Sequence, residues 1–333
     1  MLPLVSVVVT VHDRVQFLRN ALASAISQTV RSFEIIVTDD SNNPETKSIC
    51  DSFDCPDIRY RSNLAPLGVA LNLRAGISEA RGKYIAILND DDSWEPEFLA
   101  RLLTPLENSS ERVLAFADHW IMSENGEIDV GQTDENTARY RRDILPEGEI
   151  RDWETQAILD HTVPLAMAAI FRKDTVNWNL VVKDVAGAYD FWITCLLAST
   201  RRPAYYVPKR ISRYRIHSSM ETARKAAGKN ENMVFIFARL IELGMFPQLK
   251  VALRQRYRDA LFVCGKDYLL FDRVARAREY FLKSCKTSVN PKGLAGLLLT
   301  YLPRRLRSKC LTAFKKRRIE KLSPLFAPDD SAS

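Results

Sequence analysis

The feature that most constrains the fold of this chain is an apolar run that ends abruptly in acidic residues. Residues 84–88 are rich in Ile and Leu and are typical of a buried strand, and Asn89 and the three aspartates at 90–92 follow directly. Pro96 suits the first turn of a following helix. The carboxylates are therefore predicted at the C-terminal end of a strand, which is the edge where open α/β sheets bind their ligands.

Three adjacent carboxylates repel one another unless a cation or hydrogen-bond donors hold them. A hard divalent metal ion suits such a group of oxygen atoms. The alternative is a solvated acidic turn that only caps the next helix, since Asp and Ser side chains accept hydrogen bonds from the free amides at a helix start. The acidic turn alone does not decide between these interpretations.

Strands and helices alternate along the first half of the chain. Continuous β-branched or apolar runs predict strands, and apolar residues three and four positions apart predict helices. This alternation predicts the α/β fold class, with a doubly wound, mostly parallel sheet flanked by helices. The predicted strands are 4–10, 33–38, 58–61, 84–88 and 113–121, and the predicted helices are 15–27 and 69–81.

Polar side chains follow several of these strands. Thr10, His12 and Asp13 come at the end of the first strand, and Asp39 and Asp40 come at the end of the second. Because the carboxyl ends of parallel strands meet at one edge, these residues and the aspartates at 90–92 are expected to face one cleft. The convergence favours a polar or metal-bearing ligand site over an isolated acidic turn.

The composition is that of an ordinary globular protein. The 333 residues are 46% hydrophobic, which is enough for a sizeable core. The six cysteines show neither paired spacing nor a dense framework, so we expect no structural zinc site and no disulfide scaffold. We see no secretory signal pattern and no apolar run of the ~20 residues that a membrane span needs, and we therefore expect a cytoplasmic protein.

The positive charge is concentrated near the C-terminus. The formal net charge is +7, and nine Lys or Arg residues with a single glutamate lie between Arg304 and Lys321, so the rest of the chain is close to neutral. Together with the apolar stretch 294–302, this tail predicts peripheral binding to an anionic surface on the inner face of the cytoplasmic membrane. The alternative is a last core helix followed by a polar tail. A nucleic acid partner is not expected, because the charge does not cover a broad face.

Several sequence blocks, taken together, resemble the family 2 glycosyltransferases with the GT-A fold. The resemblance covers residues 4–125, and the blocks that carry it are Val5-Ser6-Val7-Val8-Val9-Thr10, Phe33-Glu34-Ile35-Ile36-Val37-Thr38-Asp39-Asp40-Ser41, Gly68 with Asn72, and Gly82-Lys83-Tyr84-Ile85 leading into Asn89-Asp90-Asp91-Asp92. It implies a nucleotide-sugar donor, with a UDP-sugar favoured, and a divalent Mg or Mn ion. It also implies transfer, with inversion, to an acceptor hydroxyl on a glycan, polysaccharide or glycolipid.

The resemblance also implies roles for particular residues. Thr10, His12, Asp40 and Asp90 match positions that bind the donor nucleotide. Asp91 matches the family's metal ligand, and one departure is that Asn89 stands where many members have the first Asp of the turn. Further residues expected at this end of the site are Asp92 for the metal, His217 for the metal or the diphosphate, and Arg215 or Arg213 for the diphosphate.

An acid in the second half of the chain precedes an apolar, aromatic helix. Taken alone, Asp190 is a helix-start carboxylate favoured by the helix dipole. The segment is also similar to the family's Glu-Asp block, which implies that Asp190 is the general base that accepts the acceptor proton. Tyr189 replaces the usual Glu, a second departure, and Asp184 is the competing candidate for the base.

These patterns predict a catalytic domain at residues 1–220 and a helical region at 221–333 that carries the basic tail. Residues 131–151 are polar and are expected to form an irregular loop beside the site. One alternative function is a scaffold protein that binds nucleotide sugar or membrane without catalysis, as the two departures suggest. A sugar nucleotidyltransferase is another, although no glycine precedes Gly68 to form that class's phosphate loop.

Overall fold

A computed structural model describes residues 2–12, 14–41, 43–217, 226–287 and 290–311. Contacts within the chain divide it into two compact units, residues 1–217 and residues 218–333, which are described separately. The predicted domain boundary at residue 220, as well as Asp13 and the basic residues from 315 onward, lies outside the described residues.

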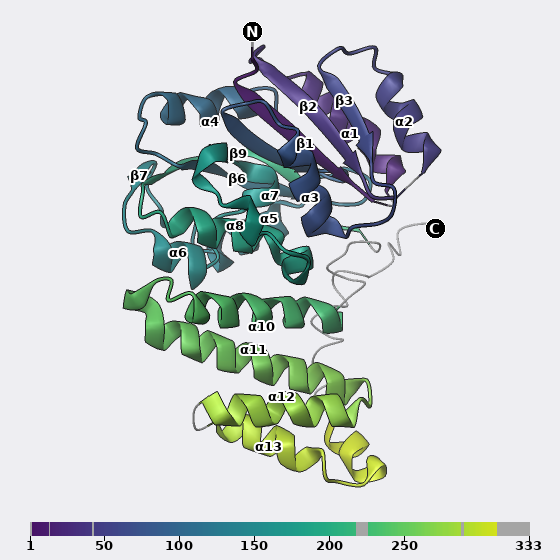
Figure 1. The fold of residues 1–333 in the computed structure, drawn as a ribbon, viewed down its shortest axis with the longest axis vertical. Helices are drawn as coiled ribbons and strands as arrows, with labels where there is room; N and C mark the ends of the chain where they lie inside the picture. Colours follow the sequence, from purple (N-terminus) through teal and green to yellow (C-terminus); the bar gives the residue numbers. More distant parts are fainter. Residues whose placement is uncertain (1, 13, 42, 218–225, 288–289, 312–333) are drawn as a thin grey trace. The chain divides into compact units, whose positions relative to one another are not determined.

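The first unit alternates strands and helices along most of its length (Figure 1). Its strands are β1 (Val5–Val11), β2 (Phe33–Asp39), β3 (Ile58–Ser62), β4 (Tyr84–Asn89), β5 (Ser93–Trp94), β6 (Leu114–Met122), β7 (Gly148–Ile150), β8 (Ala169–Arg172) and β9 (Ala204–Arg215). Its helices are α1 (Val15–Ile26), α2 (Pro44–Asp51), α3 (Val69–Ser78), α4 (Phe98–Glu107), α5 (Val130–Arg139), α6 (Glu154–Ile158), α7 (Leu165–Ala168) and α8 (Tyr189–Ala198).

The strands form one sheet in the order β3-β2-β1-β4-β8-β6-β9-β5, with β7 paired to β9. Strands β1 to β4 are parallel to one another, and β6 is parallel to β9. Strand β8 is antiparallel to both β4 and β6, and β5 and β7 are antiparallel to β9. The predicted fold class is confirmed: the sheet is mostly parallel and carries helices on its faces.

The strands β1 and β2 are buried along their whole length because helices cover both faces of the sheet (Figure 1). Val7 and Val9 face the cluster that contains Leu18 and Leu22 of α1. On the opposite face α3 lies close to the sheet at Gly76, where an added Cβ would come within 2.8 Å of a Val8 methyl carbon. Continuous apolar strands are the sequence signature of a parallel sheet covered on both sides.

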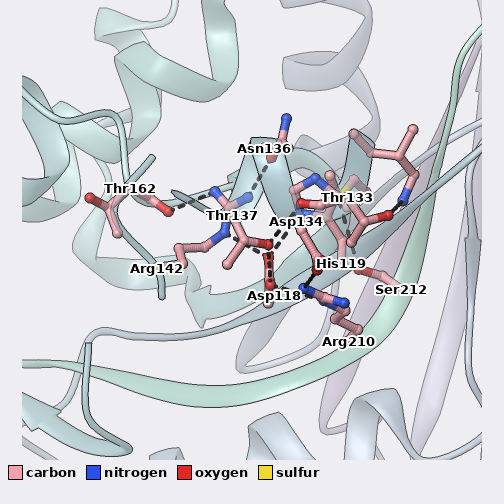
Figure 2. Close-up of polar contacts among 12 residues, drawn as sticks. Asp118, His119, Thr133, Asp134, Asn136, Thr137, Arg142, Thr162, Arg210 and Ser212 are labelled. Carbon is pink, nitrogen blue, oxygen red and sulfur yellow. Dashed lines mark hydrogen bonds and ion pairs between the residues drawn. The ribbon is translucent and has the colours of Figure 1, made fainter. Parts of the chain in front are cut away.

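The prediction of an irregular loop at 131–151 is wrong, because this segment contains α5 and β7. Figure 2 shows the contacts that hold it: the Thr137 hydroxyl donates to Asp118 Oδ2 at 2.7 Å, and Arg142 Nε donates to Asp118 Oδ1 at 2.7 Å. Asp118 and Arg142 are both buried. The buried residues of α5 are Thr133 and Thr137, so the helix lacks the apolar periodicity by which sequence analysis recognises helices.

The second unit is helical, with α10 (Ala226–Glu242), α11 (Lys250–Leu270), α12 (Val274–Thr287), α13 (Pro291–Leu299) and a further helical stretch at 304–311. Its core surrounds Phe281 of α12. Gly265 of α11 and Gly296 of α13 leave room for this ring, since an added Cβ at either would lie 2.7 Å or less from a ring carbon. None of the described helices is both long enough and apolar enough to cross a bilayer.

Candidate active site

The acidic turn lies directly after β4, at the carboxyl edge of the sheet, as predicted. The backbone N–H of Asp92 donates to the carbonyl of Asn89 at 3.3 Å, which closes a tight turn. Asp90, Asp91 and Asp92 are all buried, with Asp91 the most accessible of the three at 6% exposure. Buried carboxylates need partners, and the surrounding residues supply them.

Asp90 is held from the end of β1. The backbone N–H of His12 donates to Asp90 Oδ2 at 3.2 Å, and Arg14 Nη2 lies 2.6 Å from Asp90 Oδ1. Burial raises the pKa of Asp90 to about 7, and the repulsion of Asp91 adds to this increase, while Arg14 opposes it. The carboxylate therefore depends on a nearby positive charge to stay ionised at neutral pH.

The carboxylate of Asp91 contacts two side chains, those of Arg14 and His217. Its Oδ2 lies 3.0 Å from His217 Nε2, and the same oxygen contacts Arg14 Nη1. The His217 ring packs against Phe17 of α1 with ring centroids 5.0 Å apart. A residue 126 positions away in the sequence is thereby brought to the acidic turn.

The donor atoms around Asp91 suit a divalent cation. A carboxylate oxygen and an imidazole nitrogen approach the same point, and Mg²⁺ usually takes one or two carboxylates with phosphate oxygens rather than a full protein cage. Within the described ranges, no three His, Cys, Asp or Glu side chains are already grouped as a ready-made cage. The residues present therefore fit a cation whose coordination a diphosphate would complete.

Asp92 connects the turn to β9. Its Oδ1 accepts the backbone N–H of Arg215 at 3.0 Å, and its Oδ2 accepts a hydrogen bond from Asn89 Nδ2 at 3.0 Å. Burial, reinforced by the charge of Asp91, raises the pKa of Asp92 well above its ordinary value.

The guanidinium of Arg215 is largely engaged by backbone carbonyls. Its Nε donates to the carbonyl of Asp91 at 2.9 Å, and its Nη1 donates to the carbonyl of Glu124 at 2.7 Å. These bonds join the acidic turn to the loop after β6. That Arg215 binds the diphosphate stays a prediction.

Asp40 lies at the end of β2 and anchors the loop that leads into α3. Its oxygens accept hydrogen bonds from the backbone N–H groups of Leu67 and Gly68, both at 2.7 Å, and from Asn63 Nδ2 at 2.8 Å. Thr10, at the end of β1, contacts Asn89 Oδ1 at 3.4 Å. The structure thus places Thr10, His12 and Asp40 at one sheet edge, and their roles toward a nucleotide stay predictions.

Asp190 stands in the first turn of α8, where its Oδ1 accepts the backbone N–H of Phe191 at 2.8 Å. The neighbouring Tyr189 hydroxyl donates to Asn89 Oδ1 at 2.9 Å and so ties this helix start to the acidic turn. Ala186, just before α8, has a φ of +35°, an unfavourable conformation for a residue with a Cβ. Asp184 is exposed on the preceding 3₁₀ segment.

Sequence analysis missed Arg14 and the bond between Tyr189 and Asn89. Arg14 had one available signal, its position just after the first strand among other polar residues. The Tyr189 bond had none, because its partners lie 100 residues apart.

A family model described as glycosyl transferase family 2 matches residues 6–172. The match covers β1 to β8 and includes the acidic turn, and the chain belongs to this family. The predicted family and fold are therefore confirmed.

Individual proteins are similar to this chain in sequence or in fold. An uncharacterized glycosyltransferase of Methanocaldococcus jannaschii is 29% identical over 199 residues, covering 58% of this chain and 65% of the relative, a little less than two thirds of its length. S. aureus TarS 1–349 in complex with UDP-GlcNAc superposes with a TM-score of 0.64 at 14% identity, covering 89% of this chain and 84% of that TarS chain. The mannosyltransferase PcManGT from Pyrobaculum calidifontis, solved with GDP-Man and Mn²⁺, has a TM-score of 0.58 at 16% identity and covers 99% and 89%. These structures share the fold.

Proposed function

We propose that this protein transfers a sugar from a nucleoside-diphosphate donor, with a UDP-sugar favoured, to an acceptor hydroxyl on a glycan, polysaccharide or glycolipid, with inversion. The observation that carries the proposal is the meeting of Asp91 and His217 at 3.0 Å beside two further buried carboxylates. Such a group is suited to hold a cation and an anionic leaving group at the carboxyl edge of the sheet.

The donor nucleotide would lie along the ends of β1 and β2. Thr10 and His12 line this edge, Asp40 would bind the base, and Asp90 would face the ribose. Family membership supports these assignments, as do the relatives of this fold that bind UDP-GlcNAc or GDP-Man. The order of the strands supports a single continuous pocket, because β1 lies between β2 and β4.

A divalent Mg or Mn ion would be held by Asp91 and His217, with Asp92 close by. When bound, such an ion supplies Lewis-acid stabilisation for the charge that develops on the diphosphate as the glycosidic bond breaks. Arg14 and Arg215 add positive charge on the same side, and either guanidinium suits phosphate oxygens.

Asp190 would act as the general base. As the anomeric carbon loses its diphosphate, the acceptor hydroxyl attacks that carbon and its proton passes to the Asp190 carboxylate. An ordinary aspartate, with a pKa of ~4, is a weak base, but close positioning allows it to work because the hydroxyl becomes acidic only as the new bond forms. The exposed position of Asp184 supports Asp190 over Asp184.

The acceptor would be presented at a membrane surface through the second unit. Leu294 and Leu298 of α13 lie one helical turn apart and are 49% and 69% exposed, and Leu306 is 52% exposed. The same stretch carries the exposed cations Lys292 and Arg305. An apolar stripe with adjacent positive charge suits the interface of an anionic bilayer. We therefore propose a peripheral location on the cytoplasmic face of the membrane.

Calorimetric titration of UDP, GDP, dTDP and CDP, each with and without Mn²⁺, tests the donor class. We expect one nucleotide to bind in an Mn²⁺-dependent manner and Asp91→Asn to remove that dependence. Asp174→Asn, which changes an exposed aspartate of the same unit, is the matched control and should bind as the wild type does. Absence of binding by every nucleotide would contradict the proposal.

The main alternative is a scaffold protein that binds nucleotide sugar without catalysis. The two functions differ at Asp190: Asp190→Asn should abolish release of the nucleotide from its sugar while leaving nucleotide affinity unchanged. A wild-type protein that binds the nucleotide sugar but never turns it over, with a range of acceptors supplied, would favour the scaffold.

A further inference from the structure

The starting observation is a chain of hydrogen bonds between the start of α8 and the acidic turn. The Tyr189 hydroxyl donates to Asn89 Oδ1 at 2.9 Å, and Asn89 Nδ2 donates to Asp92 Oδ2 at 3.0 Å. Asp92 in turn accepts the backbone N–H of Arg215 at 3.0 Å. Three segments, α8, the turn after β4 and the end of β9, are thus joined by hydrogen bonds from the side chains of Tyr189 and Asn89 and the backbone of Arg215.

The groups present define the direction of these bonds. The amide oxygen of Asn89 can only accept, so the Tyr189 hydroxyl is the donor, and the amide nitrogen of Asn89 donates to Asp92 Oδ2. Tyr189 is 5% exposed, so water cannot easily replace the bond. An aspartate at position 89 would have no N–H group to donate to Asp92. A glutamate at position 189 would add a further negative charge beside the acidic turn.

The same tyrosine lies among the groups that the proposed reaction uses. Burial, with the nearby charges of Asp190, Asp92 and Asp91, raises the pKa of Tyr189 well above its ordinary value, so the hydroxyl keeps its proton. Asp190 is the next residue on the same helix turn, so a bond that fixes Tyr189 also restrains the backbone from which the Asp190 carboxylate extends.

We propose that Tyr189 and Asn89 form a positioning pair that sets the distance between the general base Asp190 and the acidic turn that holds the leaving group. This inference rests on the proposed function of Asp190. Asn89 and Tyr189, the two positions at which the chain departs from the family pattern, are therefore hydrogen-bond partners. We interpret the two departures as a different way of building the site and not as a loss of catalysis.

A first experiment tests the mechanical part without requiring activity. In Tyr189→Phe, we expect backbone amides in the peptides that span 186–192 and 89–92 to exchange hydrogen for deuterium faster than in the wild type. The control is Tyr206→Phe, which removes another buried tyrosine hydroxyl of the same unit, one that donates to the carbonyl of Arg142 at 3.3 Å. Unchanged exchange in both site peptides of Tyr189→Phe would overturn the inference.

A second experiment tests the catalytic part. The assay is release of nucleotide from UDP-GlcNAc, UDP-Glc or GDP-Man without acceptor, in which water attacks the anomeric carbon, the bond to the diphosphate breaks, and the water proton passes to Asp190. Tyr189→Phe should lower kcat about 10- to 100-fold, as expected for a misplaced catalytic group, with little change in donor KM. In an Asn89→Ala background the same change should cost less than about twofold, because the bond is already lost.

The outcomes separate the inference from the proposed function. A Tyr189→Phe rate within about twofold of the wild type, or a parallel loss of donor affinity and thermal stability, would show that the hydroxyl does not position the base. If the wild type releases no nucleotide from any donor, the proposed function is in doubt, and the exchange experiment still decides whether the pair joins α8 to the acidic turn.

Discussion

Arg14 and Asp90 form an ion pair at the carboxyl edge of the sheet, with Nη2 of the arginine 2.6 Å from Oδ1 of the aspartate. The same guanidinium also contacts Asp91. A side-chain cation therefore neutralises part of the acidic turn. A metal ion bound to Asp91 would share that carboxylate with Arg14, unless a diphosphate offered the guanidinium another partner.

The first prediction concerns this competition. Arg14→Gln should raise the affinity for Mn²⁺ without nucleotide by about 5- to 10-fold, equivalent to about 1 kcal/mol of repulsion removed. The free Mn²⁺ signal in electron paramagnetic resonance measures this affinity. Arg19→Gln, an exposed arginine of α1, is the control. Equal Mn²⁺ affinities of Arg14→Gln and the wild type would show that Arg14 does not compete with the metal.

The second prediction concerns the buried residue His119, next to Asp118, and the stability of the protein at acid pH. Burial, together with the positive charge of Arg142, lowers the pKa of His119 from 6.5 to about 3. The unfolded chain therefore binds a proton between these values that the folded protein does not bind, so His119 makes the protein less stable as the pH falls from about 6.5 to about 3.

Replacing His119 by Gln should reduce this loss. The free energy of unfolding should fall less steeply with decreasing pH in His119→Gln than in the wild type. The difference between the two slopes should be about 1.4 kcal/mol per pH unit near pH 5. Urea titrations between pH 4 and pH 8 measure the slope. Burial raises the pKa of Asp118, but Arg142, Thr137 and His119 together lower it below its ordinary value of 3.8, so Asp118 titrates below the pH range of these measurements. Parallel slopes would mean that His119 titrates normally in the folded state.

The third prediction concerns the close contact between Gly82 and β1. An added Cβ at Gly82 would lie 2.5 Å from the backbone nitrogen of Ser6, and backbone cannot move aside as a side-chain end can. Gly82→Ala should therefore lower the free energy of unfolding by about 1–3 kcal/mol. Gly131→Ala in α5, whose added Cβ would come no nearer than 3.5 Å to its neighbours, should be neutral or slightly stabilising. Chemical denaturation compares the two, and equal stabilities would contradict the role of Gly82.

The fourth prediction concerns the apolar stripe of α13. Leu298→Glu should weaken sedimentation with vesicles that contain anionic phosphatidylglycerol, because it removes apolar area and adds repulsion at the interface. Val251→Glu is the matched control, since Val251 of α11 is 72% exposed in the same unit. If both variants bind as the wild type does, or if neutral vesicles bind equally well, the membrane surface lies elsewhere or is absent.

The sequence predicted the fold well where apolar periodicity was strong. The run at Val5–Val11 and the run at Tyr84–Asn89 are parallel neighbours in the sheet, as the alternation of strands and helices implied. The helix Val130–Arg139 could not be predicted in this way, because polar bonds from Thr137 to Asp118, rather than an apolar face, hold it in place. Buried polar networks carry no periodic signal.

The local pattern was enough to place the acidic turn after β4, Thr10 at the end of β1 and Asp40 after β2, because the end of a strand is a property of a short stretch of chain. It could not show that Arg14 pairs with Asp90, or that Tyr189 donates to Asn89. Those contacts depend on the order of strands in the sheet and on how α8 packs beside it. Side chains far apart in the sequence meet only when the whole unit has folded, and their partners are therefore set by tertiary packing.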